Sequence, residues 1–337
     1  MGSPSSQPLV SIVTPVYNGA RYLSECIESV LAQTYVNWDY TIVNNCSTDE
    51  SLAIAQKYAA KDHRIRVHTN DRFVGMIENH NIAFGLIALE SKYCKVVCAD
   101  DWIYPECISQ LVELAEHNPA VGIVGSYAIS DDGIPSLGLP HGTSVFSGRH
   151  ICQLYLRGDV DAFATPSTVL YRSALVRSRV PFFPGSAASS DLAVCFICLQ
   201  TSDYGFVHQI LSFRRIHGEA ESARLQELNS FLVDRIDFVA EYGPIFLNEA
   251  EHKARLAQLL EEYYRYLAMG VVNFRNSEFW NFHKSRLDRL GYPLFCGRLA
   301  WELVNKTADL IFNSKQTFEK LLKRRRDRVR KRPGGGA

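Results

Sequence analysis

The sequence predicts an α/β fold: a doubly wound, mostly parallel sheet flanked by helices, with a helical extension at the C-terminus. In the first 125 residues, short apolar runs alternate with stretches in which apolar residues recur at helical spacing. Strands and helices that alternate through short connections build parallel sheets. From Glu221 onward the helical spacing continues without strand patterns between the helices.

Five short apolar runs in the first 125 residues are predicted to be strands. The first of them, Leu9–Thr14, is nearly continuous in apolar character, which is typical of a strand buried on both faces of a sheet. The first predicted helix spans Tyr22 to Leu31, and the second is expected to open with a capping box of Ser47 and Glu50. The predicted strands are Leu9–Thr14, Tyr40–Val43, Ile65–Thr69, Val96–Ala99 and Val121–Val124.

The second half of the chain is less regular until Phe163. Ser167–Arg172 is typical of a strand leading into a short helix. The loop Pro181–Ser190 has the composition of a mobile active-site flap. It leads to Asp191 at the start of an apolar helix, Leu192–Leu199, where an acid is a good first-turn residue. Further strand patterns follow at Gly205–Ile210 and Ser212–Ile216, and amphipathic helices at Phe231–Ala240, Ala254–Leu267 and Leu299–Leu322.

Two adjacent acids, Asp100 and Asp101, directly follow the fourth predicted strand, and Pro105 suits the first turn of the next helix. Open α/β sheets bind ligands at the carboxyl ends of their strands. Paired carboxylates in a cleft repel each other unless a cation or hydrogen-bond donors intervene. Mn²⁺ and Mg²⁺ prefer such oxygen ligands together with substrate phosphates. The pair therefore predicts a divalent cation site, with a solvated turn as the alternative.

The loops after the first, second and fourth strands are expected at one edge of the sheet. They contribute Pro15–Tyr17, Asn44–Asn45 and Asp100–Asp101. An aromatic ring, two amides and two carboxylates suit a nucleotide whose phosphates are held by a metal. The sequence has neither a Gly-x-Gly-x-x-Gly fingerprint after the first strand nor a P-loop, so the phosphates need another counter-charge.

Over roughly residues 9–220, the sequence resembles the family 2 glycosyltransferases with the GT-A fold. Four motifs in order carry the resemblance, including a Cys-Ala-Asp-Asp element that is similar to the family's Asp-x-Asp. The resemblance implies an inverting, metal-dependent enzyme that moves a sugar from a nucleoside diphosphate to a hydroxyl on a glycan or lipid-linked acceptor, in surface polysaccharide synthesis. The motifs are Val10–Gly19, Asn44–Asp49, Gly75–Asn81 and Cys98–Asp101.

The resemblance also implies roles for individual residues. Tyr17 would stack on the donor base, the backbone at Pro15 and Val16 would frame it, and Asn45 would face its edge. Asp100 would approach the ribose or the metal shell, and Asp101 would coordinate Mn²⁺ or Mg²⁺. Further residues of the implied site are Asn81 and Arg214 on the donor, His217 on the metal, and Asp191 as the catalytic base.

The sequence departs from the family's usual motifs at several positions of the implied site. Asn45 stands where the family usually has a carboxylate, and an amide can donate as well as accept. UDP is the family's usual donor nucleotide, and this departure leaves dTDP and GDP open as well. Cys98 stands where many members carry an acid, and His80 where they carry an arginine.

Asp191 has two predicted roles, one structural and one catalytic, and they are compatible. As a first-turn acid it would stabilise its own helix. Inversion at an anomeric carbon needs a base on the face opposite the leaving group, and a carboxylate can take the acceptor's proton. The stretch Arg214–His217, which reads Arg-Arg-Ile-His, is similar to an Arg-x-His segment that closes the site in the resembling family. Arg214 would stabilise charge on the diphosphate, whereas a lone histidine is more commonly structural.

The resemblance and the composition together predict the division of the chain. The net charge of zero hides a basic tail, since Lys320–Arg332 holds nine basic residues and one acid. Such a tail suits peripheral contact with an anionic membrane, with Trp280 and Trp301, or is a solvated end. The predicted segments are a tail at 1–8, a transferase domain at 9–220 with its nucleotide-binding half at 9–125 and acceptor half at 126–220, helices at 221–322, and a disordered basic tail at 323–337.

Nine cysteines, several within apolar runs, favour buried reduced thiols in a cytoplasmic protein. A peripheral position at the inner face of the membrane is the alternative. Nucleic acid is not expected as a partner, because no aromatic residue interrupts the basic tail. Two alternatives stay open. A nucleotidyltransferase would normally carry a Gly-rich basic loop at Pro15–Gly19, which is absent. A non-catalytic nucleotide-sugar sensor is compatible with the departures at Asn45 and His80.

Overall fold

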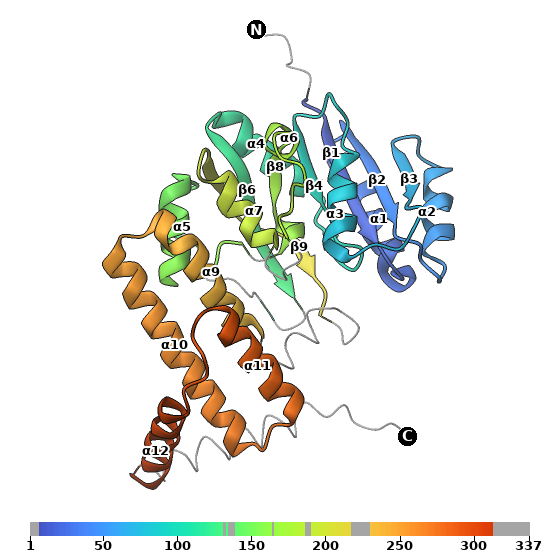
Figure 1. The fold of residues 1–337 in the computed structure, drawn as a ribbon. Coiled ribbons are helices and arrows are strands. Elements are labelled where there is room, and N and C mark those ends of the chain that lie inside the picture. The colour runs from blue at the N-terminus through green and yellow to red at the C-terminus, as the bar shows by residue number, and fades with distance from the viewer. Residues whose placement is uncertain are drawn as a thin grey trace, which may run out of the picture. The chain divides into compact units, whose positions relative to one another are not determined.

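The computed structural model describes residues 7–130, 133, 139–163, 165–185, 190–216 and 230–312. Its described residues form a nine-stranded sheet in the order β3-β2-β1-β4-β8-β6-β9-β5, with β7 paired to β9 (Figure 1). The strands are β1 (Val10–Val16), β2 (Trp38–Asn44), β3 (Ile65–Thr69), β4 (Tyr93–Val96), β5 (Trp102–Ile103), β6 (Val121–Ser130), β7 (Val145–Phe146), β8 (Leu170–Arg172) and β9 (Asp203–Arg214).

Helices flank this sheet within its own compact unit, and the described chain after β9 consists of further helices (Figure 1). They are α1 (Ala20–Leu31), α2 (Ser51–Ala59), α3 (Met76–Gly85), α4 (Cys107–His117), α5 (Gly148–Arg157), the 3₁₀ turn η1 (Pro166–Thr168), α6 (Ser173–Arg177), α7 (Ser190–Cys198), α9 (Ser230–Phe246), α10 (Glu249–Val272), α11 (Ser277–Arg289) and α12 (Cys296–Phe312).

The N-terminal half of the sheet is parallel, as predicted. β1 pairs in parallel with both β2 and β4, and β2 with β3. β8 is antiparallel to β4 and to β6, while β6 and β9 are parallel. Six of these nine strands therefore share one direction, and the prediction of a mostly parallel sheet is confirmed. The two-residue strands β5 and β7 were not predicted, because so short a run has no recognisable pattern.

The fourth strand ends earlier than predicted. β4 ends at Val96, and Val97 N still donates to Val13 O at 3.0 Å. The chain then turns, with Asp101 N donating to Cys98 O at 3.0 Å. The apolar residues after Val96 therefore belong to the turn that delivers the acids, not to the strand. Pro105 likewise lies two residues before α4 rather than in its first turn.

The predicted capping box at Ser47 and Glu50 is wrong. The side chain of Glu50 makes no cap bond, and the Asp49 carboxylate accepts instead from Ser51 N at 3.0 Å. Ser47 Oγ accepts from Asn18 N at 3.1 Å, at the start of α1. Parallel pairing of β1 and β2 brings these two loops together, so Ser47 is used across the sheet edge rather than within its own helix.

Residues of β1 alternate between the two faces of the sheet. Ile12 and Val16 belong to one buried cluster with Cys26 of α1 and Leu111 of α4. On the other face, Ser11 Oγ accepts from Ala88 N, just after α3, at 3.0 Å. Helices therefore cover both faces, as a doubly wound sheet requires.

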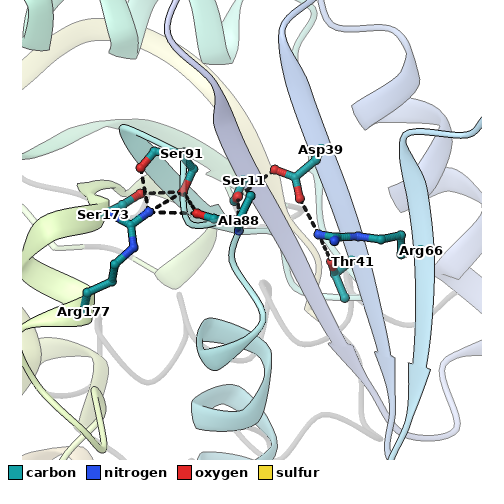
Figure 2. Close-up of polar contacts among 8 residues, drawn as sticks. All are labelled: Ser11, Asp39, Thr41, Arg66, Ala88, Ser91, Ser173 and Arg177. Atoms are coloured by element: carbon teal, nitrogen blue, oxygen red, sulfur yellow. Dashed lines mark hydrogen bonds and ion pairs between the residues drawn. The ribbon is translucent and has the colours of Figure 1, made fainter.

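Figure 2 shows a polar network near the amino ends of β1 and β2. Ser11 Oγ donates to Asp39 Oδ1 at 2.6 Å. One guanidinium nitrogen of Arg177 donates to the carbonyls of Ala88 and Ser91, each at 2.8 Å. These bonds satisfy backbone groups between α3 and β4. Because ligands meet such a sheet at the opposite, carboxyl edge, this network has a structural role.

The chain divides into two compact units, and the division falls within α9. One unit holds the sheet with its flanking helices together with residues 241–249. The described part of the other comprises residues 230–240 and 250–312, built on buried residues such as Leu259 and Tyr263 of α10 and Phe279 of α11. The predicted boundary at residue 221 and the basic tail lie outside the described residues. Among the described helices, none combines the length and apolar character needed to cross a membrane.

Candidate active site

The loops that carry the predicted donor site meet at the carboxyl edge of the sheet. Val16, at the end of β1, pairs with Asn44 at the end of β2, and Val16 O accepts from Asn45 N at 2.8 Å. The turn that bears Asp100 and Asp101 leaves β4 beside β1. The strand order β2-β1-β4 therefore gathers all three loops at one edge.

Asp101 is the most constrained acid at this edge, and its side chain is 4% exposed. Its Oδ2 accepts from Ser167 Oγ at 2.6 Å, and its Oδ1 accepts from Arg215 N at 3.1 Å. Burial, together with the adjacent Asp100 carboxylate, raises the pKa of Asp101 to about 7. The hydrogen bonds from Ser167 and Arg215 favour the ionised form and so lower this pKa, but they do not offset the burial. An ionised Asp101 therefore needs more positive charge than its neighbours supply.

The donor set fits a divalent cation that is shared with a substrate. Among the described residues no three His, Cys, Asp or Glu side chains gather as a complete metal site. Mg²⁺ and similar ions are commonly held by one or two carboxylates, with phosphates and water completing the shell. Asp101, with Asp100 beside it, supplies such a partial site. His217, the other predicted ligand, lies outside the described residues.

We expect the stability of the unliganded protein to rise as the pH falls from about 8 to about 5. The raised pKa of Asp101 means that the folded state binds this proton more tightly than the unfolded chain does. Stability from this group is therefore fully present in acid and is lost as the pH rises through about 7. Tm measured across this range should show the trend, and Asp101→Asn should flatten it. An equal slope in that variant would assign the effect to other groups.

Asp191 lies in the first turn of α7, as predicted. Its Oδ1 accepts from Leu192 N at 2.9 Å, so the carboxylate caps its own helix. Burial raises the pKa of Asp191, opposed by the Leu192 N–H and by the positive charge of Arg214. Arg214 likewise opposes the raised pKa of Asp101. Pro166 and Val169 line the hollow beside Asp191, and Ser167, between them in sequence, binds Asp101, so one short turn connects the surroundings of the two acids.

A small hollow lies beside Asp191. Its walls are mostly apolar, which limits the water around the carboxylate and agrees with its raised pKa. The lining residues are Phe163, Thr165, Pro166, Val169, Tyr171, Asp191, Leu192 and Cys195.

Two aromatic rings stand exposed at the same edge. Tyr17 is 49% exposed and Phe73 57%, and their ring centroids lie 4.7 Å apart. Exposed rings offer faces on which a nucleotide base can stack. Phe73 was not predicted as a site residue, although its position in the loop just before Gly75 could have indicated a stacking role.

Asn45 organises the loop that carries Phe73. It is 2% exposed, its Nδ2 donates to Val74 O at 2.8 Å, and its Oδ1 accepts from Val74 N at 3.0 Å. Asn70 Nδ2 also donates to Oδ1, at 3.0 Å. The oxygen thus has two donors and the amide nitrogen keeps one further N–H. Contact of Asn45 with the edge of a base stays a prediction.

Asn81 holds the backbone of Phe183. Its Nδ2 donates to Phe183 O at 3.0 Å, and its Oδ1 accepts from Phe183 N at 2.7 Å. Phe182 and Phe183 are buried, with ring contacts to Phe84 of α3. The start of the predicted flap is therefore anchored, and residues 186–189 lie outside the described residues. Both polar atoms of Asn81 bind the backbone of Phe183, and contact of Asn81 with the donor stays a prediction.

Replacing Asn81 with alanine should lower the free energy of unfolding by about 1–3 kcal/mol, because the N–H and C=O of Phe183 both lose a partner. Denaturant unfolding measures this change. The matched control is Asn37→Ala, which removes one exposed bond to Gln7 O and should change stability little. Equal effects of the two variants would contradict the anchoring role of Asn81.

Backbone N–H groups at the start of α1 bind side chains between β2 and the first residue of α2. Those of Asn18, Gly19 and Ala20 donate to Ser47, Ser51 and Asp49 at 2.9–3.1 Å. Asn18 adopts the left-handed φ of 50°, which asparagine tolerates. These bonds occupy the N–H groups of Gly19 and Ala20, which belong to the set that a helix N-terminus offers to anions elsewhere.

Arg215 and Ser167 support the acidic turn, and neither was predicted. Arg215 Nε donates to Asp100 O at 3.1 Å, and its guanidinium pairs with Glu25 of α1 at 2.5 Å. The same group lies over the ring of Tyr22, 4.4 Å from the centroid. The acidic turn is therefore tied to α1 and to the end of β9.

Curated relatives match part of the chain. A glycosyltransferase of Haemophilus influenzae is 34% identical over 120 residues, 36% of each protein. TuaG of Bacillus subtilis, assigned to teichuronic acid biosynthesis, is 33% identical over 130 residues, 38% of this chain and 51% of TuaG. The chain thus spans about a third to a half of the length of these relatives.

Solved structures share the fold at low identity, and residues 11–179 match a family profile. TarS residues 1–349 of S. aureus, in complex with UDP-GlcNAc, has a TM-score of 0.60 at 17% identity, covering 82% of this chain and 79% of that one. The mannosyltransferase PcManGT of Pyrobaculum calidifontis, in complex with GDP-Man and Mn²⁺, has a TM-score of 0.53 at 14% identity, covering 93% and 89%. The matched profile, over half of the chain, is that of glycosyl transferase family 2, and the chain belongs to this family.

Proposed function

We propose that this chain is an inverting, metal-dependent glycosyltransferase that moves a sugar from a nucleoside diphosphate to a hydroxyl of a growing surface glycan. The observation that carries the proposal is that the loops bearing Tyr17, Asn45 and Asp101 meet at the carboxyl edge of the sheet, where ligands bind. The teichuronic acid assignment of TuaG supports the surface-glycan role, and the UDP-GlcNAc bound to TarS supports the donor class.

The donor would lie across the carboxyl edge of the sheet. Its base would stack on Tyr17 with Phe73 beside it, framed by the backbone at Pro15 and Val16. Asp100 would contact the ribose or the cation shell. Asp101 would hold Mn²⁺ or Mg²⁺, which when bound offsets negative charge on the diphosphate.

Asp191 would act as the general base. Its carboxylate takes the proton of the acceptor hydroxyl while that oxygen bonds to the anomeric carbon, on the face opposite the diphosphate. The bond from this carbon to the diphosphate oxygen breaks, and the nucleoside diphosphate leaves with the electron pair. Burial raises the pKa of Asp191 and so makes it a stronger proton acceptor than an exposed aspartate. Arg214 adds positive charge beside the departing diphosphate.

UDP is the first candidate for the nucleotide, with dTDP and GDP as alternatives. The acceptor is proposed to be a glycan or a lipid-linked glycan. Trp301 on α12 is 63% exposed, which agrees with a peripheral contact at the cytoplasmic face of a membrane, together with the basic tail outside the described residues.

The proposal is tested with a panel of UDP, dTDP and GDP sugars, each with and without Mn²⁺ or Mg²⁺. We expect one nucleotide to raise Tm in a cation-dependent way, and its sugar to be released or transferred. Binding without any sugar release would favour a non-catalytic sensor. Pyrophosphate release from a nucleoside triphosphate would favour a nucleotidyltransferase. Either result would overturn the proposed function.

A further inference from the structure

A fully buried lysine lies in the middle of the sheet. Lys95, on β4 between β1 and β8, is 0% exposed. Its Nζ donates to Ser167 O at 2.5 Å and is 3.4 Å from Val169 O. Within the described part of the chain, this ammonium group thus bonds backbone carbonyls rather than a carboxylate. Burying a charge is costly, and apolar residues of similar size commonly serve stability as well or better.

Ser167 connects this lysine to the acidic turn. Its side chain is 0% exposed, and its Oγ donates to Asp101 Oδ2 at 2.6 Å. The same Oγ accepts from Cys98 N at 3.0 Å, at the start of the turn that bears Asp101. The carbonyl of Ser167 faces Lys95 while its hydroxyl faces Asp101. One residue therefore transmits the position of the buried lysine to the carboxylate.

The short turn around Ser167 also forms part of the wall beside Asp191. Pro166 and Val169 line the hollow next to that carboxylate. The turn is closed by Thr168 Oγ1, which donates to Thr165 O at 2.7 Å. Residues 165–169 therefore lie next to both Asp101 and Asp191. A shift of this turn would change the surroundings of both carboxylates.

We propose that Ser167 and Lys95 are positioning residues for the transfer reaction. Ser167 orients the Asp101 carboxylate toward the donor's diphosphate and its cation, and Lys95 fixes the turn from which Ser167 acts. The inference rests on the proposed function, because it takes Asp101 as the ligand of the cation. Partners that orient a metal ligand commonly affect metal affinity or activity about 10- to 100-fold when they are removed.

The test compares Ser167→Ala and Lys95→Met with the wild-type protein and with Ser173→Ala. Ser173 is equally buried, but its hydroxyl bonds that of Ser91 at 3.1 Å in the network of Figure 2, away from the acids. Binding of the preferred nucleoside diphosphate is titrated at increasing Mn²⁺, and Tm is measured for each protein. The Mn²⁺ concentration for half-maximal binding is the readout, because a merely structural role would not change it.

We expect Ser167→Ala and Lys95→Met to need about 10- to 100-fold more Mn²⁺ than the wild type. Lys95→Met should do so without a loss of Tm, whereas Ser173→Ala should lower Tm and keep the wild-type Mn²⁺ requirement. An unchanged requirement in folded Ser167→Ala would overturn the inference, even if Lys95→Met failed to fold. If the wild-type protein bound the diphosphate without any need for Mn²⁺, the metal role of Asp101 in the proposed function would be overturned too. The wild-type titration therefore distinguishes a failure of the proposed function from a failure of the positioning role alone.

Discussion

Replacing Asp191 with asparagine is expected to slow sugar transfer by about 10²- to 10⁴-fold, the range that a general base contributes. The amide keeps an oxygen for the bond from Leu192 N, so the first turn of α7 should persist. It cannot take a proton from the acceptor hydroxyl, and that loss affects the chemical step alone. Affinity for the nucleoside diphosphate should therefore change by less than about twofold.

Single-turnover transfer and diphosphate titration measure these two quantities separately. Asp62→Asn is the matched control, because Asp62 pairs with Arg64 in the loop before β3, outside the proposed site. It should transfer sugar at the wild-type rate. Near-normal transfer by the Asp191 variant would exclude this carboxylate as the base and leave it only its capping role.

Replacing Asp101 with asparagine is expected to remove the cation dependence of diphosphate binding and to lower transfer by at least about 10²-fold. The cause is the loss of a buried negative charge that no neighbouring acid replaces in the same position. Tm should not fall in neutral buffer, because burial raises the pKa of Asp101 and makes its ionised form unfavourable in the folded state. Loss of function without loss of stability is the distinguishing result.

The paired measurement is a Mn²⁺ titration of diphosphate binding by Asp101→Asn and Asp100→Asn. Asp100 contributes a backbone carbonyl to Arg215, and that bond survives its substitution. Asp100→Asn should therefore weaken binding but keep its dependence on Mn²⁺. If instead Asp100→Asn lost the dependence and Asp101→Asn kept it, the assignment of the two acids would be reversed.

The strands of the parallel half could be predicted because their signal is local. The buried run of β1 and the acids after β4 are visible in consecutive residues, and the alternation with helices indicates a parallel sheet. The same local reasoning found Asp191 at the start of α7. It failed for Ser47, whose hydroxyl bonds Asn18, 29 positions away, rather than its own helix.

The roles of the amides and of the support residues could not be predicted, because their partners are distant in sequence. Asn81 binds Phe183 across 102 positions, and Ser167 reaches Asp101 across 66. Lys95 directly precedes the predicted strand Val96–Ala99, and its sequence neighbours gave no sign of its buried carbonyl partner. Such contacts depend on the order of β4 and β8, which the sequence pattern did not reveal.

The central claim is that one crevice holds a divalent ion on Asp101 and a donor sugar in front of Asp191. A crystal structure with the preferred nucleoside diphosphate and Mn²⁺, with the metal located by its anomalous scattering, tests this claim most directly. The account predicts a Mn²⁺ peak bound to Asp101 and to the diphosphate, with the sugar end of the diphosphate directed toward Asp191. A diphosphate bound elsewhere, or a metal that does not contact Asp101, would contradict it.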